Sequence, residues 1–136
     1  MSPRGRYRLV LAAALGAALL TPSAASASFG MSGPTAFDAG AQPEGIAIGD
    51  LNGDGKQDVV VANVQAGGGV SVLLNTTAPG ASTPSFSGPF NFSDGGGNTP
   101  VAVAIADVNG DGKPDLVVAN SSGTGVSVLL NTTTPG

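Results

Sequence analysis

Apolar residues alternate with small or polar residues in several short stretches of this chain. Ile46 and Ile48 alternate in this way before a polar segment, and such a period of two indicates a strand with one buried face. Short runs rich in valine and leucine follow the polar segments, as expected for strands covered on both faces. The stretches that predict strands are residues 46–48, 59–61, 70–74, 86–92, 101–105, 116–118 and 126–130. No segment after residue 27 shows a helical period, so an all-β protein is predicted.

The stretch 86–92 is interrupted by Gly88 and Pro89. Proline cannot donate to a sheet ladder, so this strand is expected at an edge or with a bulge. Phe86, Phe90 and Phe92 are expected to contribute to the core of the sheet rather than to a ligand platform.

The chain repeats itself. DLNGDGKQD at residues 50–58 returns as DVNGDGKPD at residues 107–115, 57 positions later, and VSVLLNTTAPG returns as VSVLLNTTTPG. Each repeat predicts three or four short antiparallel strands, and stacking such sheets radially gives a β-propeller. The expected fold is therefore two antiparallel propeller-type blades in an incomplete propeller, with blade one at about residues 37–92 and blade two at about 93–136. Because propellers usually contain about four to eight blades, the chain is either a fragment of a longer array or completes a ring by self-association.

The N-terminus has the pattern of a secretory signal. Arg4, Arg6 and Arg8 precede an apolar run at residues 9–20, and Ala25, Ser26 and Ala27 form a small-residue cleavage site. The alternative is a membrane anchor, but twelve residues of helix rise only about 18 Å, short of the ~30 Å apolar core of a bilayer. A signal-peptide helix at residues 1–27, cleavage near Ala27 and a secreted repeat region at 28–136 are predicted, with no membrane contact after cleavage.

Removal of the signal leaves Lys56 and Lys113 against nine acids, a net charge of about −7. This sign excludes nucleic acid as a partner and favours a divalent cation. The chain has no cysteine, so no disulfide stabilises the exported domain.

The repeated nonapeptide has the spacing of a calcium loop. Counted from Asp50, oxygen-bearing side chains stand at positions one, three, five and nine, and glycine stands at position six. Calcium takes six to eight oxygen ligands, and position seven of such loops supplies its backbone carbonyl. A helix–loop–helix site and a dockerin both require a carboxylate at position twelve, where this chain has Val61 and Val118. A strand–loop–strand calcium hairpin remains. Turn formation alone would not demand three mutually repelling carboxylates in nine residues.

The pattern D-x-N-x-D-G-x-x-D between two strands, followed by V-S-V-L-L-N, resembles the FG-GAP repeat, also called the VCBS-type repeat, of integrin α-subunit propellers and bacterial exported proteins. Phe37 and Asp38, and residues 40–43, only loosely keep the letters that name the family. The resemblance covers nearly all of residues 37–136 and implies propeller blades with one structural Ca²⁺ in each repeat. The implied metal ligands are Asp50, Asn52, Asp54, the Lys56 carbonyl, Asp58, Asp107, Asn109, Asp111, the Lys113 carbonyl and Asp115.

Composition argues against catalysis. The mature chain has no histidine for a Ser-His-Asp arrangement, and the acids outside the two loops are only Asp38, Glu44 and Asp94. We therefore predict a secreted calcium-binding repeat protein that is not an enzyme, with a structural or adhesion role. By analogy with the family, an extracellular protein or glycan is the expected class of ligand. The alternatives are a partial or non-functional fragment of a larger exported propeller and, less in keeping with the composition, part of an extracellular enzyme.

Overall fold

The computed structural model describes residues 28–65, 68–95, 98–123 and 125–134. The signal-peptide helix expected within residues 1–27 lies outside the described residues. The chain divides into a short unit, Met1–Met31, and a larger unit, Ser32–Gly136, in which all the described strands lie. None of the described ranges holds a helix long and apolar enough to span a bilayer.

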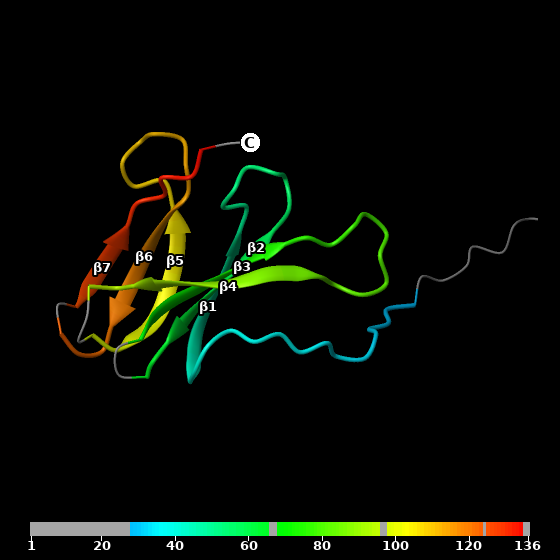
Figure 1. Ribbon diagram of the computed structural model, residues 1–136, viewed down its shortest axis with the longest axis horizontal. Helices are drawn as coiled ribbons and strands as arrows, with labels where there is room; N and C mark the ends of the chain where they lie inside the picture. The colour runs from blue at the N-terminus through cyan, green and yellow to red at the C-terminus, as the bar shows by residue number, and fades with distance from the viewer. Residues whose placement is uncertain (1–27, 66–67, 96–97, 124, 135–136) are drawn as a thin grey trace, which may run out of the picture. The chain divides into compact units, whose positions relative to one another are not determined.

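The larger unit contains two antiparallel sheets (Figure 1). The first sheet has the order β1-β2-β3-β4 and the second the order β5-β6-β7, so neighbouring strands follow one another along the chain. The strands are β1 Pro43–Gly49, β2 Asp58–Asn63, β3 Gly69–Asn75, β4 Phe86–Ser93, β5 Pro100–Ala106, β6 Asp115–Asn120 and β7 Val126–Leu129. The prediction of an all-β chain with two antiparallel sheets is confirmed. Over the described ranges the two sheets form no closed barrel.

Strand β2 lies at the centre of the first sheet and is covered on both faces. Val60 pairs with Ala47 of β1 and with Val72 of β3, whereas its neighbour Val61 points to the opposite face. Both valines are buried. The run of β-branched residues that predicted a doubly covered strand therefore occupies such a position.

Strand β4 is the edge strand that its proline predicts. It pairs with β3 alone, and the register shifts between Val72 and Leu74, opposite Gly88 and Pro89. The Gly88–Pro89 peptide bond is cis, and Gly88 has a φ of 113°. A residue without a Cβ adopts this backbone readily, so glycine at the bulge is explained by conformation.

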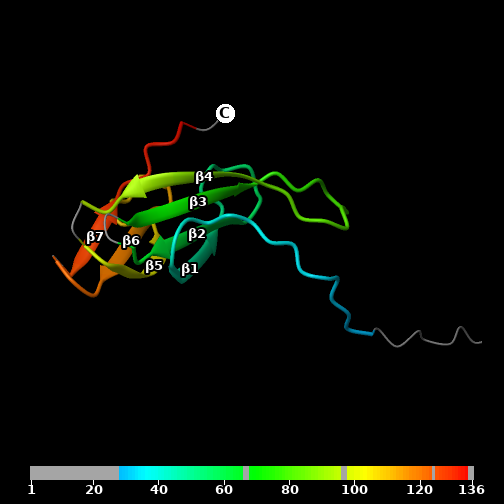
Figure 2. The ribbon, with the colours of Figure 1, turned by 60° about the horizontal axis from the view of Figure 1, so that its bottom comes forward.

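The core of the larger unit lies between the two sheets. The first sheet contributes Val60, Val70 and Val72, and the second contributes Leu116 and Val118. Strand β1 contacts β5 at this interface, as Figure 2 shows with β1 beside β5. The approach is close, because a Cβ added to Gly45 would lie 2.7 Å from the Ala102 Cα. Glycine at position 45 thus sets the spacing between the two blades.

Candidate metal centre

The two repeated loops connect the first two strands of each sheet. Gly49 pairs with Asp58 across the end of the β1–β2 hairpin, and Ala106 pairs with Asp115 across the end of the β5–β6 hairpin. The residues between these pairs form the connections. Each nonapeptide therefore lies between two antiparallel strands, as the sequence predicts.

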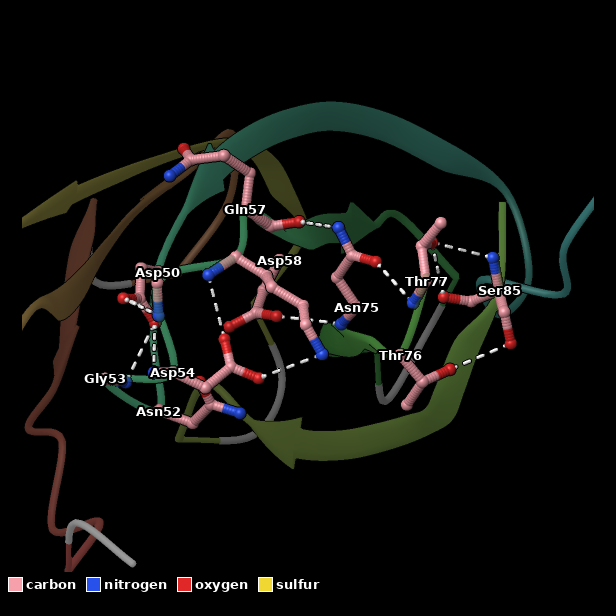
Figure 3. Close-up of polar contacts among 12 residues, drawn as sticks. Asp50, Asn52, Gly53, Asp54, Gln57, Asp58, Asn75, Thr76, Thr77 and Ser85 are labelled. Carbon is pink, nitrogen blue, oxygen red and sulfur yellow. Dashed lines mark hydrogen bonds and ion pairs between the residues drawn. The ribbon is translucent and has the colours of Figure 1, made fainter. Parts of the chain in front are cut away.

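Asp50 organises the first loop by accepting hydrogen bonds from the backbone. Its Oδ1 accepts from the amides of Gly53 at 2.8 Å and Asp54 at 3.2 Å, and its Oδ2 accepts from Gly55 at 2.8 Å. Two smaller turns follow the same direction: Asn52 Oδ1 accepts from the Asp54 amide at 3.1 Å, and Asp54 Oδ1 accepts from the Lys56 amide at 2.9 Å. Figure 3 shows Asp50, Asn52 and Asp54 gathered at this curl. Successive Asx turns of this kind wind a loop tightly.

The second loop repeats these bonds atom for atom. Asp107 Oδ1 accepts from Gly110 at 2.7 Å and Asp111 at 3.2 Å, and Asp107 Oδ2 accepts from Gly112 at 2.8 Å. The two smaller turns of this loop join Asn109 Oδ1 to the Asp111 amide at 3.0 Å and Asp111 Oδ1 to the Lys113 amide at 2.9 Å. The repetition shows that the nonapeptide itself determines the loop conformation.

Glycine is required in the loop for its backbone conformation. Gly55 has a φ of 82° and Gly112 a φ of 81°, and nothing lies within 4 Å of a Cβ added to either residue. Space is therefore available at both positions, but the left-handed backbone disfavours other residues.

Asp58 is fully buried and joins three parts of the first sheet. Its Oδ2 accepts from the Leu51 amide at 2.9 Å, and its Oδ1 accepts from the Asn75 amide at 2.8 Å. It thereby connects the start of β2 to the loop and to the end of β3, as Figure 3 shows for Asp58 and Asn75. A buried carboxylate is tolerated where such donors replace water.

Asp115 makes the equivalent bonds in the second sheet. Its oxygens accept from the amides of Val108 at 3.0 Å and Asn131 at 2.8 Å. The Asn131 amide lowers the pKa of the Asp115 carboxyl from its ordinary value of 3.8, burial opposes this shift, and the Val108 amide adds to the lowering. A lowered pKa means that ionised Asp115 stabilises the fold at neutral pH, and this contribution is lost as the pH falls through the lowered pKa.

Asn75 and Asn131 are site residues that the ligand pattern does not reveal. Asn75 Nδ2 donates to the Gln57 carbonyl at 3.0 Å, and Asn131 Nδ2 donates to the Pro114 carbonyl at the same distance. Each asparagine also presents its backbone amide to the buried aspartate. The identical asparagine that ends VSVLLN in both repeats was the available signal, because a repeated polar residue at a strand end indicates a specific bond.

The oxygen-bearing side chains of the two loops are of the chemical type that binds a hard cation such as calcium. The side chains in the loop curl present oxygen acceptors to their neighbours. Asp50 Oδ2 and Asp54 Oδ1 each accept only one of the hydrogen bonds described, which leaves a lone pair on each oxygen for a cation. The loop side chains do not all converge on one point. Among the described residues, no three Asp, Glu, His or Cys side chains lie close enough together to hold a metal. Lys56 Nζ lies 3.8 Å from Asp54 Oδ2, so its charged end lies beside the loop. The assignment of the ten ligands, Asp58 and Asp115 included, stays a prediction.

Comparison with known proteins agrees with the repeated geometry. The family profile of the FG-GAP-like repeat matches residues 50–118, about half of the chain, from the first loop through the second loop into β6. No curated protein and no solved structure shows significant similarity to the chain. The matched segment contains both Asp-rich loops, strands β2 to β5 and the first residues of β6. The chain therefore belongs to the FG-GAP-like repeat family, a β-propeller type of repeat protein.

Proposed function

We propose that this chain is an exported calcium-binding repeat module whose metal ions have a structural role. The observation that carries the proposal is the duplicated curl, in which Asp50, Asn52 and Asp54 and their counterparts in the second repeat are held by the same backbone bonds. Two copies of one oxygen-rich loop indicate a shared ligand. FG-GAP-like repeats in general provide structure or binding rather than catalysis, which favours the same class of role.

Calcium, when bound, would supply a positive charge that neutralises the loop carboxylates. In the first repeat, Asp50, Asn52 and Asp54 would hold it with side-chain oxygens and Lys56 with its carbonyl. Asp58 would anchor the loop to the sheet and add an oxygen. Extracellular modules bind calcium with Kd values of about 10⁻⁴–10⁻³ M, so ~2 mM calcium would add about 0.6–1.8 kcal/mol per site. That contribution is a useful part of the stability of a small domain without disulfides.

Calcium titration with thermal unfolding tests the metal assignment. We expect calcium to raise the melting temperature of the chain, EDTA to reverse the increase, and Asp54→Ala combined with Asp111→Ala to abolish it. Asp38→Ala is the matched control, because Asp38 is an exposed acid outside both loops whose carboxylate accepts a hydrogen bond from the Gly40 amide. A melting curve that is the same in calcium and in EDTA would refute the proposal.

Export is tested separately. The chain expressed with its own N-terminus in a secreting host should be recovered outside the cell with Ser28 as its first residue. Recovery in the membrane fraction with Met1 intact would contradict the signal-peptide assignment and favour an anchor. Neither result depends on calcium binding.

A further inference from the structure

Each sheet has one face in the core and one face turned away from it. The outward face of the second sheet, here the Val126 face, comprises Ala104, Val117, Val126, Val128 and Leu130. The outward face of the first sheet, here the Ile46 face, comprises Ile46, Ile48, Val59, Val61 and Leu73. Ile46, Ile48, Val126, Val128 and Leu130 are exposed, so both faces present large apolar side chains. Several exposed apolar side chains on one face of a sheet indicate an interaction site.

The Val126 face is the counterpart of a face that is already buried. The repeat places Val128 where the first sheet has Val72, and the side chain of Val72 is 7% exposed whereas that of Val128 is 52% exposed. Val72 is buried because it packs in the core against the second sheet. The first sheet therefore shows what covers a face of this composition: the opposite face of another repeat.

The Ile46 face is the counterpart of the surface that provides this cover. Ile46 and Ile48 correspond to Val103 and Ile105 of β5, which pack against the core between the sheets. Part of the Ile46 face is already covered, since Val61 and Leu73 are buried whereas Ile46 and Ile48 are exposed. The open part lies along β1, which is the counterpart of β5, the strand of the second sheet that contacts β1 and β2 in the existing interface.

One hydrogen bond between the two repeats is made at the existing interface, and its counterpart at the two open faces is not made within the described part of the chain. Asn131 Nδ2 donates to the Leu51 carbonyl at 2.9 Å as well as to Pro114, and Leu51 is 8% exposed. Its counterpart Val108 is 49% exposed, and among the described residues Asn75 Nδ2 donates only to Gln57. Asn75 on the first sheet thus corresponds to the donor Asn131, and Val108 on the second sheet corresponds to the acceptor Leu51. Together they could form a second bond of the same kind.

We propose that the Val126 face of one chain binds the Ile46 face of a second copy, head to tail, and so repeats the packing found within the chain. In this interface the Asn75 amide of one copy donates to the Val108 carbonyl of the other. A head-to-tail contact uses different patches on the two partners, so it closes into a ring when the rotation permits. About two to four copies would supply the four to eight blades of a typical propeller. Ala102 and Ala106 stand where the existing interface has Gly45 and Gly49, so the second interface is wider by about one methyl group.

Disulfide trapping tests the proposed contact, because the chain has no cysteine of its own. In the existing interface, a Cβ added to Gly49 would lie 3.8 Å from the Ile105 Cβ, a typical Cβ separation for a disulfide. The counterparts between copies are Ala106 and Ile48. An oxidised mixture of the Ala106→Cys and Ile48→Cys chains should give a disulfide-linked dimer containing one of each. A mixture of Ala106→Cys with Ala78→Cys, in an exposed turn outside both faces, is the matched control and should stay uncrosslinked.

Paired surface variants give an independent measurement. Size-exclusion chromatography with light scattering should show the purified chain as an oligomer, and Ile48→Lys and Val128→Lys as monomers. An equimolar mixture of the two variants should form a dimer that grows no further, because only one intact pair of faces remains. Ala78→Lys should associate like the parent chain, and Ala102→Gly, which removes the extra methyl, should associate more tightly.

Several outcomes would overturn the proposal. A parent chain that is monomeric at about 100 µM would do so, since a useful interface has a Kd below this range. An oligomer that survives one of the two lysine substitutions would show a symmetric contact or one made by another segment. Circular dichroism of each lysine variant at low concentration separates loss of association from unfolding, and crosslinking remains decisive for any variant that unfolds. Calcium binding is measured separately, so failure of either hypothesis is recognised on its own.

Discussion

The side-chain amide of Asn131 donates to the backbone carbonyl of Leu51 at 2.9 Å, although the two residues lie 80 positions apart. Asn131 follows β7 at the end of the second sheet, and Leu51 lies in the Asp-rich loop of the first sheet. Because Leu51 also gives its amide to Asp58 and its side chain to the core, one loop residue is linked to both sheets. The first loop is therefore coupled to the packing of the blades.

Asn131→Ala should destabilise the chain more than Asn75→Ala. Both substitutions remove a bond to the carbonyl before the buried aspartate, but only Asn131→Ala also removes the bond to Leu51. The difference in the free energy of unfolding should be about 1 kcal/mol, the usual net value of one hydrogen bond. Urea unfolding in EDTA, at a concentration below any self-association, measures it. Equal losses would show that the Leu51 bond contributes nothing.

Asp58→Asn should destabilise the chain even without calcium. An amide nitrogen in place of one carboxylate oxygen would face either the Leu51 amide or the Asn75 amide, two donors that the aspartate satisfies. Loss of a hydrogen bond to a charged group lowers the free energy of unfolding by about 1.5–3 kcal/mol. Chemical denaturation in EDTA provides the measurement, with exposed Asp38→Asn as the control. Unchanged stability in EDTA would mean that Asp58 acts only as a metal ligand.

Gly45→Ala should weaken the contact between the two sheets. The added methyl carbon would lie 2.7 Å from the Ala102 Cα and 2.8 Å from the Val101 carbonyl oxygen, so the backbones must separate. Overpacking of this kind typically costs about 1–3 kcal/mol. Gly33→Ala is the control, because nothing lies within 4 Å of its added Cβ. Similar melting temperatures for the two variants would contradict the close approach of β1 and β5.

The two loops should respond differently to loss of calcium. On the proposed function, Asp54→Ala and Asp111→Ala should each leave one calcium per chain by isothermal titration calorimetry. Asp54→Ala should remove the larger part of the thermal shift, because the first loop is bonded to the second sheet through Leu51. For a domain of this size, each kcal/mol corresponds to about 4–8 °C. A larger loss in Asp111→Ala would contradict the coupling.

The local structure could be predicted because it is determined by neighbouring residues. Alternation in β1, the proline of β4 and the glycine spacing of the loops each act within a few residues. The contact between Asn131 and Leu51 could not be predicted, since it depends on which face of one sheet packs against the other. The spacing places Asp58 at position nine of the loop, but its hydrogen bonds from the Leu51 and Asn75 amides could not be predicted. Sequence spacing identifies a side chain with oxygen atoms, but it does not show which backbone amides donate hydrogen bonds to those atoms.

The asparagine that ends VSVLLN has a consequence for how such chains grow. In Asn131, one amide group closes its own hairpin through Pro114 and also reaches the preceding repeat through Leu51. A repeat copied in tandem therefore brings with it the residue that attaches it to its neighbour. Gene duplication can then lengthen the array without any new mutation at the joints. The number of blades then depends on the number of duplications and not on changes to the residues between repeats.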